Sequence, residues 1–188
     1  LVTLDYEIHS LDVITAFLLA DLKEDVYIKI PKGYPIQGTK PGQVLKLNKC
    51  LYGLKQSPME WNAKLDGILK DLGFVPTFTD PCVYVNQDKI WYIMIYVDDL
   101  LIGTKTTSEM DEIKRMIKEQ LPVTDKGPLT HYLNIWFKRN RLTKTVILSQ
   151  PNKITKLLND PQLSQKDLLV IRKPRKIPAN SNTFLTKD

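Results

Sequence analysis

The spacing of apolar residues predicts two amphipathic helices in this chain of 188 residues. The first is expected between Ser57-Pro58-Met59-Glu60, which is typical of a capping box with proline at the first helical position, and Gly73, which favours a helix end. Its apolar face consists of Trp61, Leu65, Ile68, Leu69 and Leu72. The second has Ser108 as its expected N-cap, and its apolar face consists of Met110, Ile113, Ile117 and Leu121. Shorter helical segments are predicted over residues 15–22 and 154–158.

Short apolar runs and alternating apolar and polar residues predict strands between the helices. The expected strands are residues 7–13, 26–30, 44–47, 83–85, 90–97, 100–103, 132–137 and 146–148. Asn86-Gln87-Asp88-Lys89 favours a hairpin, the last two strands are expected to form another, and loops are predicted over residues 31–42 and after Pro122. Antiparallel hairpins interleaved with two helices indicate an α+β fold, in which the helices cover one face of a small antiparallel sheet.

The composition is that of a globular protein with a basic balance. Hydrophobic residues make up 43% and charged residues 26%, which is enough for a core, and the formal net charge of +6 fits a polyanionic partner. Two cysteines and two histidines are too few and too scattered for a zinc site. Apolar runs stay below the about 18 to 20 residues that a membrane span needs, so we expect no membrane partner. Without a targeting signal, the expected location is the cytoplasm or a particle within it.

Two adjacent carboxylates, Asp98 and Asp99, interrupt the longest apolar run, Ile93–Ile102. Burying two ionised carboxylates side by side is costly unless a cation neutralises them, and a hairpin turn at the sheet end lowers that cost by exposing them. Carboxylate oxygens suit Mg²⁺, and two such ions can clamp the attacking and leaving oxygens of a phosphoryl displacement. The alternative is that both residues form a solvated β-turn, since aspartate is a favoured turn residue.

A further carboxylate, Asp12, stands at the end of another predicted strand and precedes Thr15-Ala16-Phe17-Leu18. An isolated aspartate at a strand end is often a helix cap. Together with Asp98 and Asp99, however, it completes the kind of carboxylate set that holds divalent ions in nucleotidyl-transfer sites.

Five segments in sequence order resemble the motifs of copia-type (Pseudoviridae) long-terminal-repeat retrotransposon reverse transcriptases. They are Leu11–Leu18, Val26–Tyr34, Leu51–Pro58 with Trp61, Asp80–Tyr84 and Tyr96-Val97-Asp98-Asp99. The resemblance covers residues 1 to about 158. It implies an RNA-directed DNA polymerase domain of a retrotransposon polyprotein, in which residues 1–160 form the palm with the primer-grip hairpin and a partial thumb or connection region. Residues 161–188 are expected to be a basic tail, loosely ordered or truncated.

The same resemblance implies roles for individual residues. Asp12, Asp98 and Asp99 would be catalytic and, with the backbone carbonyl of Val13, would hold two Mg²⁺ ions, for which Mn²⁺ can substitute. The residues implied to contact the nucleotide and template are Phe17, Tyr52, Gly53, Lys55, Gln56, Ser57 and Pro58. Those implied near the primer are Tyr96, Val97, Leu133 and Asn134. Phe17 would stack beneath the incoming sugar and exclude a 2′-hydroxyl; its alternative is a plain core aromatic. Expected partners are an RNA or DNA template–primer, deoxynucleoside triphosphates and other parts of the polyprotein.

The sequence also departs from the family pattern. Leu19-Ala20 stands where the family usually has Asn-Gly, Tyr132-Leu133-Asn134 where it has Phe-Leu-Gly, and Thr124-Asp125-Lys126-Gly127 where it has Lys-Asp-Leu-Gly. The chain starts 11 residues before Asp12, so most of the fingers region, which precedes that motif in the family, is expected to be missing, as is the ribonuclease H domain.

These observations leave three hypotheses. The first is a reverse-transcriptase palm, with polymerase activity by ancestry and little activity expected of this chain alone, because the missing fingers should weaken nucleotide binding. The second is a non-catalytic remnant or domesticated fragment that at most binds nucleic acid, for which binding would weaken steeply with salt and no nucleotide would be incorporated. The third is an unrelated two-metal nuclease, which would shorten a primer where a polymerase would extend it.

Overall fold

The main body of the protein is a six-stranded antiparallel sheet. The computed structural model describes residues 5–33, 38, 42–86, 88 and 90–160. In spatial order the strands are β4 (Val75–Pro76), β5 (Val83–Asn86), β6 (Trp91–Tyr96), β7 (Asp99–Thr104), β1 (Glu7–Val13) and β8 (Val123–Pro128). Each neighbouring pair is antiparallel. The sequence therefore predicted the strand direction and the β5–β6 and β6–β7 hairpins correctly.

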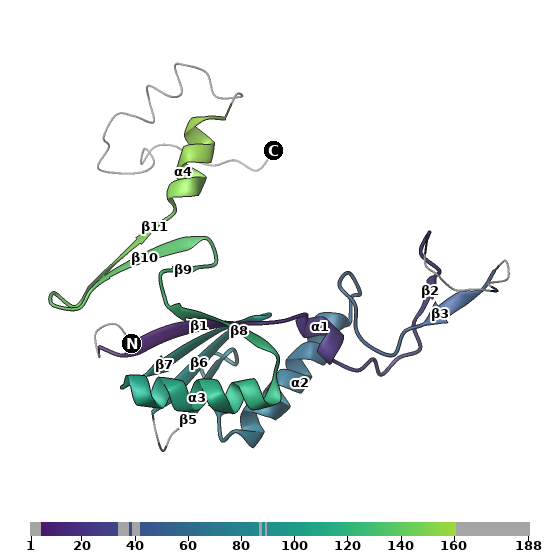
Figure 1. Cartoon of the computed structure of the whole chain (residues 1–188), viewed down its shortest axis with the longest axis horizontal. Coiled ribbons are helices and arrows are strands. Elements are labelled where there is room, and N and C mark those ends of the chain that lie inside the picture. Colours follow the sequence, from purple (N-terminus) through teal and green to yellow (C-terminus); the bar gives the residue numbers. More distant parts are fainter. Residues whose placement is uncertain (1–4, 34–37, 39–41, 87, 89, 161–188) are drawn as a thin grey trace.

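Two helices, α2 (Ser57–Asp71) and α3 (Thr107–Gln120), cover one face of this sheet (Figure 1). Side chains at alternate positions of the central strands, among them Leu11, Ile93 and Ile102, are fully buried in one cluster with Leu65 of α2 and Ile113 of α3. Because neighbouring side chains of a strand point to opposite faces, the residues between them lie on the face away from the helices. Within the described part of the chain, no helix is long and apolar enough to span a membrane.

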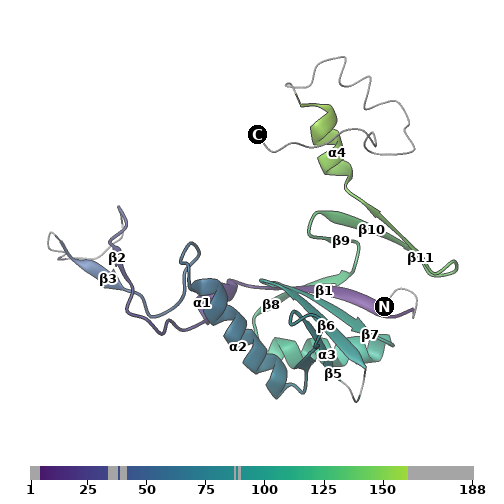
Figure 2. The same cartoon turned by 180° about the vertical axis from the view of Figure 1, so that it is seen from behind.

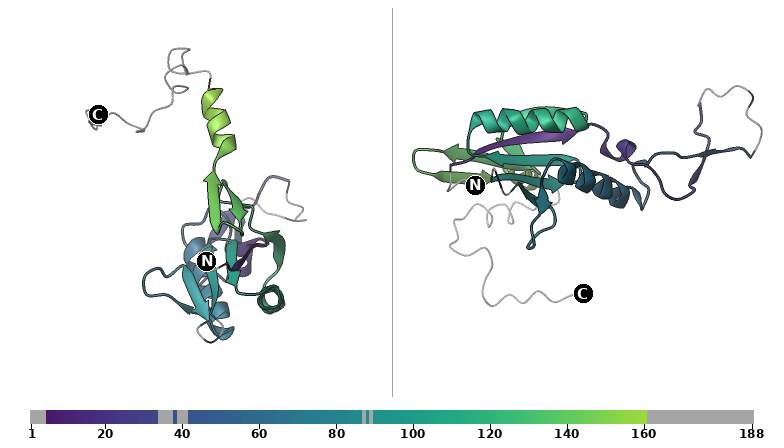
Figure 3. Two further views of the ribbon diagram at one scale, coloured as in Figure 1. Left: turned by 90° about the vertical axis from the view of Figure 1, so that its left-hand side faces the viewer. Right: turned by 90° about the horizontal axis from the view of Figure 1, so that it is seen from below.

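Two smaller units extend from the body. The short helix α1 (Ala16–Leu19) leads to a ribbon of β2 (Tyr27–Lys29) and β3 (Val44–Lys46), which projects away from the six-stranded sheet (Figures 1 and 2). A three-stranded sheet of β9 (His131–Tyr132), β10 (Ile135–Asn140) and β11 (Thr145–Ser149) lies beyond the β1–β8 edge, and α4 (Pro151–Leu158) follows it (Figure 3). The exposed helix α4 buries none of its residues.

Both long helices begin at residues other than those predicted. The N-cap of α2 is Gln56, and Ser57 lies inside the helix, where its hydroxyl donates to Leu51 O over 2.7 Å. Because Ser57 is not the N-cap, the expected capping box with Glu60 does not form, and the Glu60 carboxylate pairs with Lys23 Nζ at 2.9 Å. The predicted end at Gly73 is confirmed: its φ is +84°, a conformation that glycine adopts without strain.

The N-cap of α3 is Thr106, not Ser108. Thr106 Oγ1 accepts from the backbone N–H of Glu109 over 3.2 Å, and the Glu109 carboxylate accepts from the N–H of Thr106 over 2.8 Å. This reciprocal pair is a capping box, which satisfies two amide groups that the first turn would otherwise leave unpaired.

Three further segments differ from the prediction. The segment after Pro122 is the edge strand β8 and not a loop; its largely exposed residues give it little apolar signal. Leu133 and Asn134, predicted inside a strand, form a turn between β9 and β10 with φ of 48° and 63°. The two-residue strand β4 was not predicted. The predicted basic tail, residues 161–188, lies outside the described residues.

Candidate active site

The β6–β7 hairpin turns through only two residues, Val97 and Asp98, because Tyr96 and Asp99 are paired across it. Val97 has φ of 58°, an unusual conformation for a β-branched residue. Strain of this kind costs roughly 1–3 kcal/mol and persists only where neighbours hold it in place. Here the N–H of Val13 donates to Asp98 O over 2.8 Å, and the indole of Trp61 donates to Val97 O over 2.6 Å. The turn that carries Asp98 is thus fastened to β1 and to α2.

Asp12 is the direct partner of Asp99 in the antiparallel ladder between β1 and β7. Paired residues of a ladder project from the same face of a sheet. Since Leu11 and Leu100 are buried beneath the helices, the two carboxylates lie on the opposite face. The fold therefore gathers the three predicted catalytic aspartates at one end of the sheet: Asp12 and Asp99 side by side, and Asp98 in the adjoining turn.

Mutual repulsion is visible in the electrostatics of this site. Burial, followed by the charges of Asp98 and Asp12, raises the pKa of Asp99 above its ordinary value, and Lys126 opposes this rise. Burial and the charge of Asp99 also raise the pKa of Tyr132 to about 12. A cation among these groups stabilises their ionised form. The fold places one cation, Lys126, beside these carboxylates, and its Nζ lies 3.1 Å from Asp12 Oδ1 in the described part of the chain.

The donor chemistry of the three aspartates fits a hard divalent cation such as Mg²⁺, which binds carboxylate oxygen and tolerates water as its remaining ligands. Their side chains do not form a ready-made cage: in the described ranges, no three or more His, Cys, Asp or Glu side chains are grouped so that they could hold a metal ion. Backbone pairing places Asp12 and Asp99 side by side. Their carboxylates repel each other, and the carboxylate of Asp12 pairs with Lys126.

A cleft of about 320 Å³ connects the carboxylates with the turn between β9 and β10. Its lining residues are Ser10, Asp12, Asp99, Lys126, His131, Tyr132, Leu133 and Asn134. Leu133 and Asn134, two of the four predicted primer residues, therefore lie across the cleft from Asp12 and Asp99. Both have positive φ, as the residues of a tight type I′ hairpin do.

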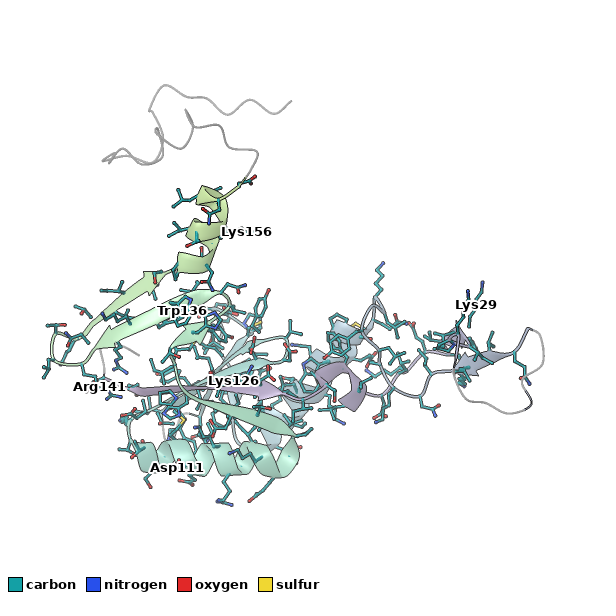
Figure 4. All side chains as sticks on the ribbon, turned by 45° about the horizontal axis from the view of Figure 1, so that its top comes forward. Lys29, Asp111, Lys126, Trp136, Arg141 and Lys156 are labelled. Atoms are coloured by element: carbon teal, nitrogen blue, oxygen red, sulfur yellow. The ribbon has the colours of Figure 1, made fainter. Side chains whose placement is uncertain are left out.

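Two arginines of β10 and its following turn tie the three-stranded sheet to β1. Arg139 donates to Tyr6 O and, over 2.8 Å, to Asp5, while Arg141 pairs with Glu7. Arg141 is labelled at the far end of the β10–β11 hairpin in Figure 4. These contacts fix the sheet that carries Leu133 and Asn134 relative to the strand that carries Asp12.

A second cleft, of about 260 Å³, lies beside the β6–β7 turn. It is lined by Phe17, Pro58, Trp61, Asn62, Leu65, Cys82, Ile95, Tyr96 and Val97. The fold thus brings two predicted nucleotide residues, Phe17 and Pro58, to the two remaining primer residues, Tyr96 and Val97. The ring of Phe17 is half-buried and packs against the ring of Tyr52, with centroids 4.7 Å apart.

Five residues of the predicted nucleotide-contacting set, Tyr52 among them, line neither cleft. Gly53 has φ of +94° in the turn before α2, and Lys55 beside it is exposed. Gln56 donates to Glu24 over 3.1 Å. The hydroxyl of the buried Ser57 is engaged by the backbone, as described above, so this side chain holds the turn in place.

Sequence reasoning missed the roles of Trp61 in fastening the turn and of Lys126 in contacting Asp12. The signal for Trp61 was present, since it belongs to the motif Leu51–Pro58 with Trp61 that resembles the family. Lys126 had no such signal, because its approach to Asp12 depends on how β8 pairs with β1.

Comparison with known proteins gives a consistent family assignment. Residues 2–172 match the family model described as reverse transcriptase (RNA-dependent DNA polymerase). The chain is 37% identical over 159 residues to the retrovirus-related Pol polyprotein from transposon TNT 1-94 of Nicotiana tabacum, covering 83% of the chain and 12% of that protein. It is 37% identical over 136 residues to the Pol polyprotein from transposon RE1 of Arabidopsis thaliana, covering 71% and 9%.

A shorter relative is the putative transposon Ty5-1 protein of Saccharomyces cerevisiae, 32% identical over 127 residues, covering 66% of the chain and 41% of that protein. The chain thus spans less than half the length of each of these relatives. The family match extends over most of the chain and includes both clefts and all three aspartates. The chain belongs to the reverse transcriptase (RNA-dependent DNA polymerase) family, of the copia-type retrotransposon kind.

Proposed function

We propose that residues 5–160 form the palm and primer-grip region of an RNA-directed DNA polymerase, with Asp12, Asp98 and Asp99 as its catalytic carboxylates. The observation that carries this proposal is the pairing of Asp12 with Asp99 beside the Asp98 turn. Aspartates from two strands, far apart in the sequence, project beside the turn on the face that the helices leave open. A solvated turn or an isolated helix cap would not require this convergence.

In this proposal the carboxylates and the backbone carbonyl of Val13 would hold two Mg²⁺ ions, for which Mn²⁺ could substitute. When bound, the metal supplies Lewis acidity at the primer 3′-hydroxyl and positive charge at the pyrophosphate leaving group. The protein's own groups position the reactants, which is where much of the catalysis of phosphoryl transfer originates. The fastening of the Asp98 turn by Val13 and Trp61 provides that rigidity.

The two clefts would both take part in substrate binding: Asp12 and Asp99 line the first, and the second lies beside the β6–β7 turn. Tyr96, Val97, Leu133 and Asn134 would contact the primer end. Phe17 would lie beneath the sugar of the incoming deoxynucleotide, held by its ring contact with Tyr52. Gly53, Lys55, Gln56, Ser57 and Pro58 would shape the nucleotide and template side, since they form the turn and first residues of α2.

Basic residues on the β2–β3 side would track the nucleic-acid backbone. Lys29, labelled on β2 in Figure 4, and Lys55 are exposed. Lys46 and Lys49 are paired with Asp25 and Asp21, which reduces the charge that they offer to phosphates. The relatives are Pol polyproteins, so other parts of such a polyprotein are the proposed protein partners.

The test is whether the chain forms a ternary complex with template–primer and the correct deoxynucleotide. A template–primer whose primer ends in a dideoxynucleotide blocks chemistry, so fluorescence anisotropy reports its dissociation alone. With Mg²⁺, the correct next deoxynucleotide should slow dissociation, and a mismatched one should not. Asp12→Asn should lose this effect. Asp71→Asn, at an exposed aspartate at the end of α2, should retain it.

The competing function is nucleic-acid binding without catalysis. The observation in its favour is that Asp12 is already engaged by Lys126. If binding weakens steeply with salt, while neither Mg²⁺ nor any deoxynucleotide changes dissociation, the basic surface alone accounts for the interaction and the polymerase proposal fails.

A further inference from the structure

Lys126 reaches Asp12 through an irregularity of the sheet. In the pairing of β1 with β8, Leu11 is opposite Asp125 and Ser10 is opposite Gly127, so Lys126 is one extra residue on β8. Such a β-bulge bends the strand and re-aims a side chain, and bulges occur often beside active sites. Gly127, with φ of +74°, allows the backbone to make this bend. Figure 4 shows Lys126 near the centre, on β8, the edge strand of the six-stranded sheet.

The contact uses an oxygen that the proposed metal ion needs. Lys126 Nζ donates to Asp12 Oδ1 over 3.1 Å and also lines the cleft with Asp99. A hydrogen bond from an ammonium group occupies a lone pair of the carboxylate, and its charge repels a divalent cation that approaches the same oxygen. The two cations therefore compete for Asp12.

We propose that Lys126 is a built-in counter-ion of Asp12, which a divalent cation must displace, and that Lys126 thereby sets the metal affinity of the site. This inference rests on the proposed function, because it takes Asp12 to be a metal ligand. It makes Lys126 a positioning residue, which holds the carboxylates in order before metal binds.

The structure allows the displacement. The side chain of Lys126 is 50% exposed and that of Asp12 is 34% exposed, so the ammonium group can move into solvent without a buried charge being left unpaired. Ion pairs at such exposure are weak, and their loss changes an equilibrium by roughly two- to fivefold. Lys126 should therefore tune metal binding and not abolish it.

The test is Mn²⁺ binding to the whole chain without substrates, measured by electron paramagnetic resonance, which detects free Mn²⁺. Lys126→Met and Lys126→Gln should each tighten binding about two- to fivefold. Lys126→Arg keeps the cation and should bind Mn²⁺ like the unaltered chain. Lys70→Met is a matched control, because Lys70 pairs with Asp66 at 2.7 Å on α2 with similar exposures of 53% and 29%. Asp12→Asn identifies the site by weakening binding.

The outcomes distinguish a failure of this inference from a failure of the proposed function. If Asp12→Asn weakens Mn²⁺ binding, but neither neutral variant of Lys126 binds more tightly than Lys70→Met, the role of Lys126 is overturned and the metal site stands. If Asp12→Asn binds Mn²⁺ as tightly as the unaltered chain, or if the unaltered chain binds no Mn²⁺, both proposals fall. Thermal unfolding of each variant without metal checks that the compared proteins are folded, and the second neutral variant serves if the first is not.

Discussion

The indole Nε1 of Trp61 donates to the carbonyl oxygen of Val97 over 2.6 Å, which joins the first turns of α2 to the tip of the β6–β7 hairpin. Trp61 is 2% exposed, so it is a fixed point of the core. Val97 is the residue with positive φ that precedes Asp98. The position of the Asp98 carboxylate therefore depends on a helix that contributes no carboxylate to the site.

Replacing Trp61 by phenylalanine should affect the site more than its cost in stability suggests. The change removes the indole donor and leaves the Val97 carbonyl without that partner. This should lower the unfolding free energy by about 1–3 kcal/mol. Of the two hydrogen bonds that fasten the turn, only the one from the N–H of Val13 would remain. We expect lower affinity of the site for Mn²⁺ and slower incorporation, measured beside chemical denaturation of the same sample.

The control is Trp91→Phe. Trp91 is as deeply buried as Trp61 but lies at the opposite end of β6 from the turn. The Trp91→Phe protein should lose a comparable amount of unfolding free energy and keep the metal affinity of the unaltered chain. Equal losses of metal affinity in both variants would contradict the role assigned to Trp61.

Asp99→Asn should stabilise the metal-free protein at neutral pH. The pKa of Asp99 is raised by burial and then by Asp98 and Asp12. A carboxyl group whose pKa is higher in the folded than in the unfolded state contributes stability at low pH, and this contribution is lost as pH rises through the folded pKa. The variant should gain roughly 1 kcal/mol or less at pH 7.

The gain of Asp99→Asn should disappear below about pH 4, where the aspartate also protonates in the unfolded chain. Denaturation in the presence of a metal chelator, repeated across this pH range, measures the difference directly. A variant that is less stable than the unaltered chain at pH 7 would show that repulsion among the carboxylates is not what governs Asp99.

His9 should make the fold sensitive to mild acid. Burial, and then the charge of Lys114, lowers the pKa of His9, while Asp125, Glu7 and Asp111 act in the opposite direction. Nδ1 of His9 lies 2.7 Å from Lys114 Nζ, and the neutral imidazole can accept from that ammonium group. A lowered folded pKa contributes stability above the unfolded value of about 6.5, and this stability is lost as pH falls through the folded pKa.

His9→Gln should therefore flatten the decline of unfolding free energy between about pH 7 and pH 5. The amide of glutamine still offers an acceptor to Lys114 but does not titrate. His131→Gln, at the exposed second histidine, should leave the decline unchanged. Identical pH profiles for the two variants would rule out His9 as the titrating group.

Phe17→Ala tests the proposed sugar contact against the alternative of a packing role. Removing the ring opens the cleft beside Tyr96, so discrimination between deoxynucleotides and ribonucleotides should fall by roughly ten- to a hundredfold in the ratio of kcat/KM. Phe137→Ala, at a half-buried residue of β10 outside both site clefts, is the matched control. Unaltered discrimination in a folded Phe17→Ala protein would reduce Phe17 to a packing residue.

The sequence was informative where a local pattern decides the structure. Asp98 and Asp99 interrupt an apolar run, and that interruption placed the hairpin turn correctly. Thr106 and Glu109 also had the spacing of a capping box, so the choice of Ser108 overlooked a stronger local signal.

The remaining features depend on register, which no short pattern specifies. The pairing of Asp12 with Asp99 needs β1 to align with β7, and the approach of Lys126 needs the bulge opposite Ser10 and Leu11. A shift of one residue would send each of these side chains to the other face of the sheet. The edge strand β8 is largely exposed, so its sequence lacks the apolar alternation that identifies a strand.

Primer extension on an RNA template tests the central claim most directly, with Mg²⁺, deoxynucleotides and Asp98→Asn as the comparison. The carbonyl of Asp98 and not its side chain accepts from Val13, so the variant should keep the turn. The account predicts that the unaltered chain extends the primer and that Asp98→Asn slows extension by at least roughly a hundredfold. Equal extension by both proteins, or no extension by a folded chain that binds the template–primer, would contradict it.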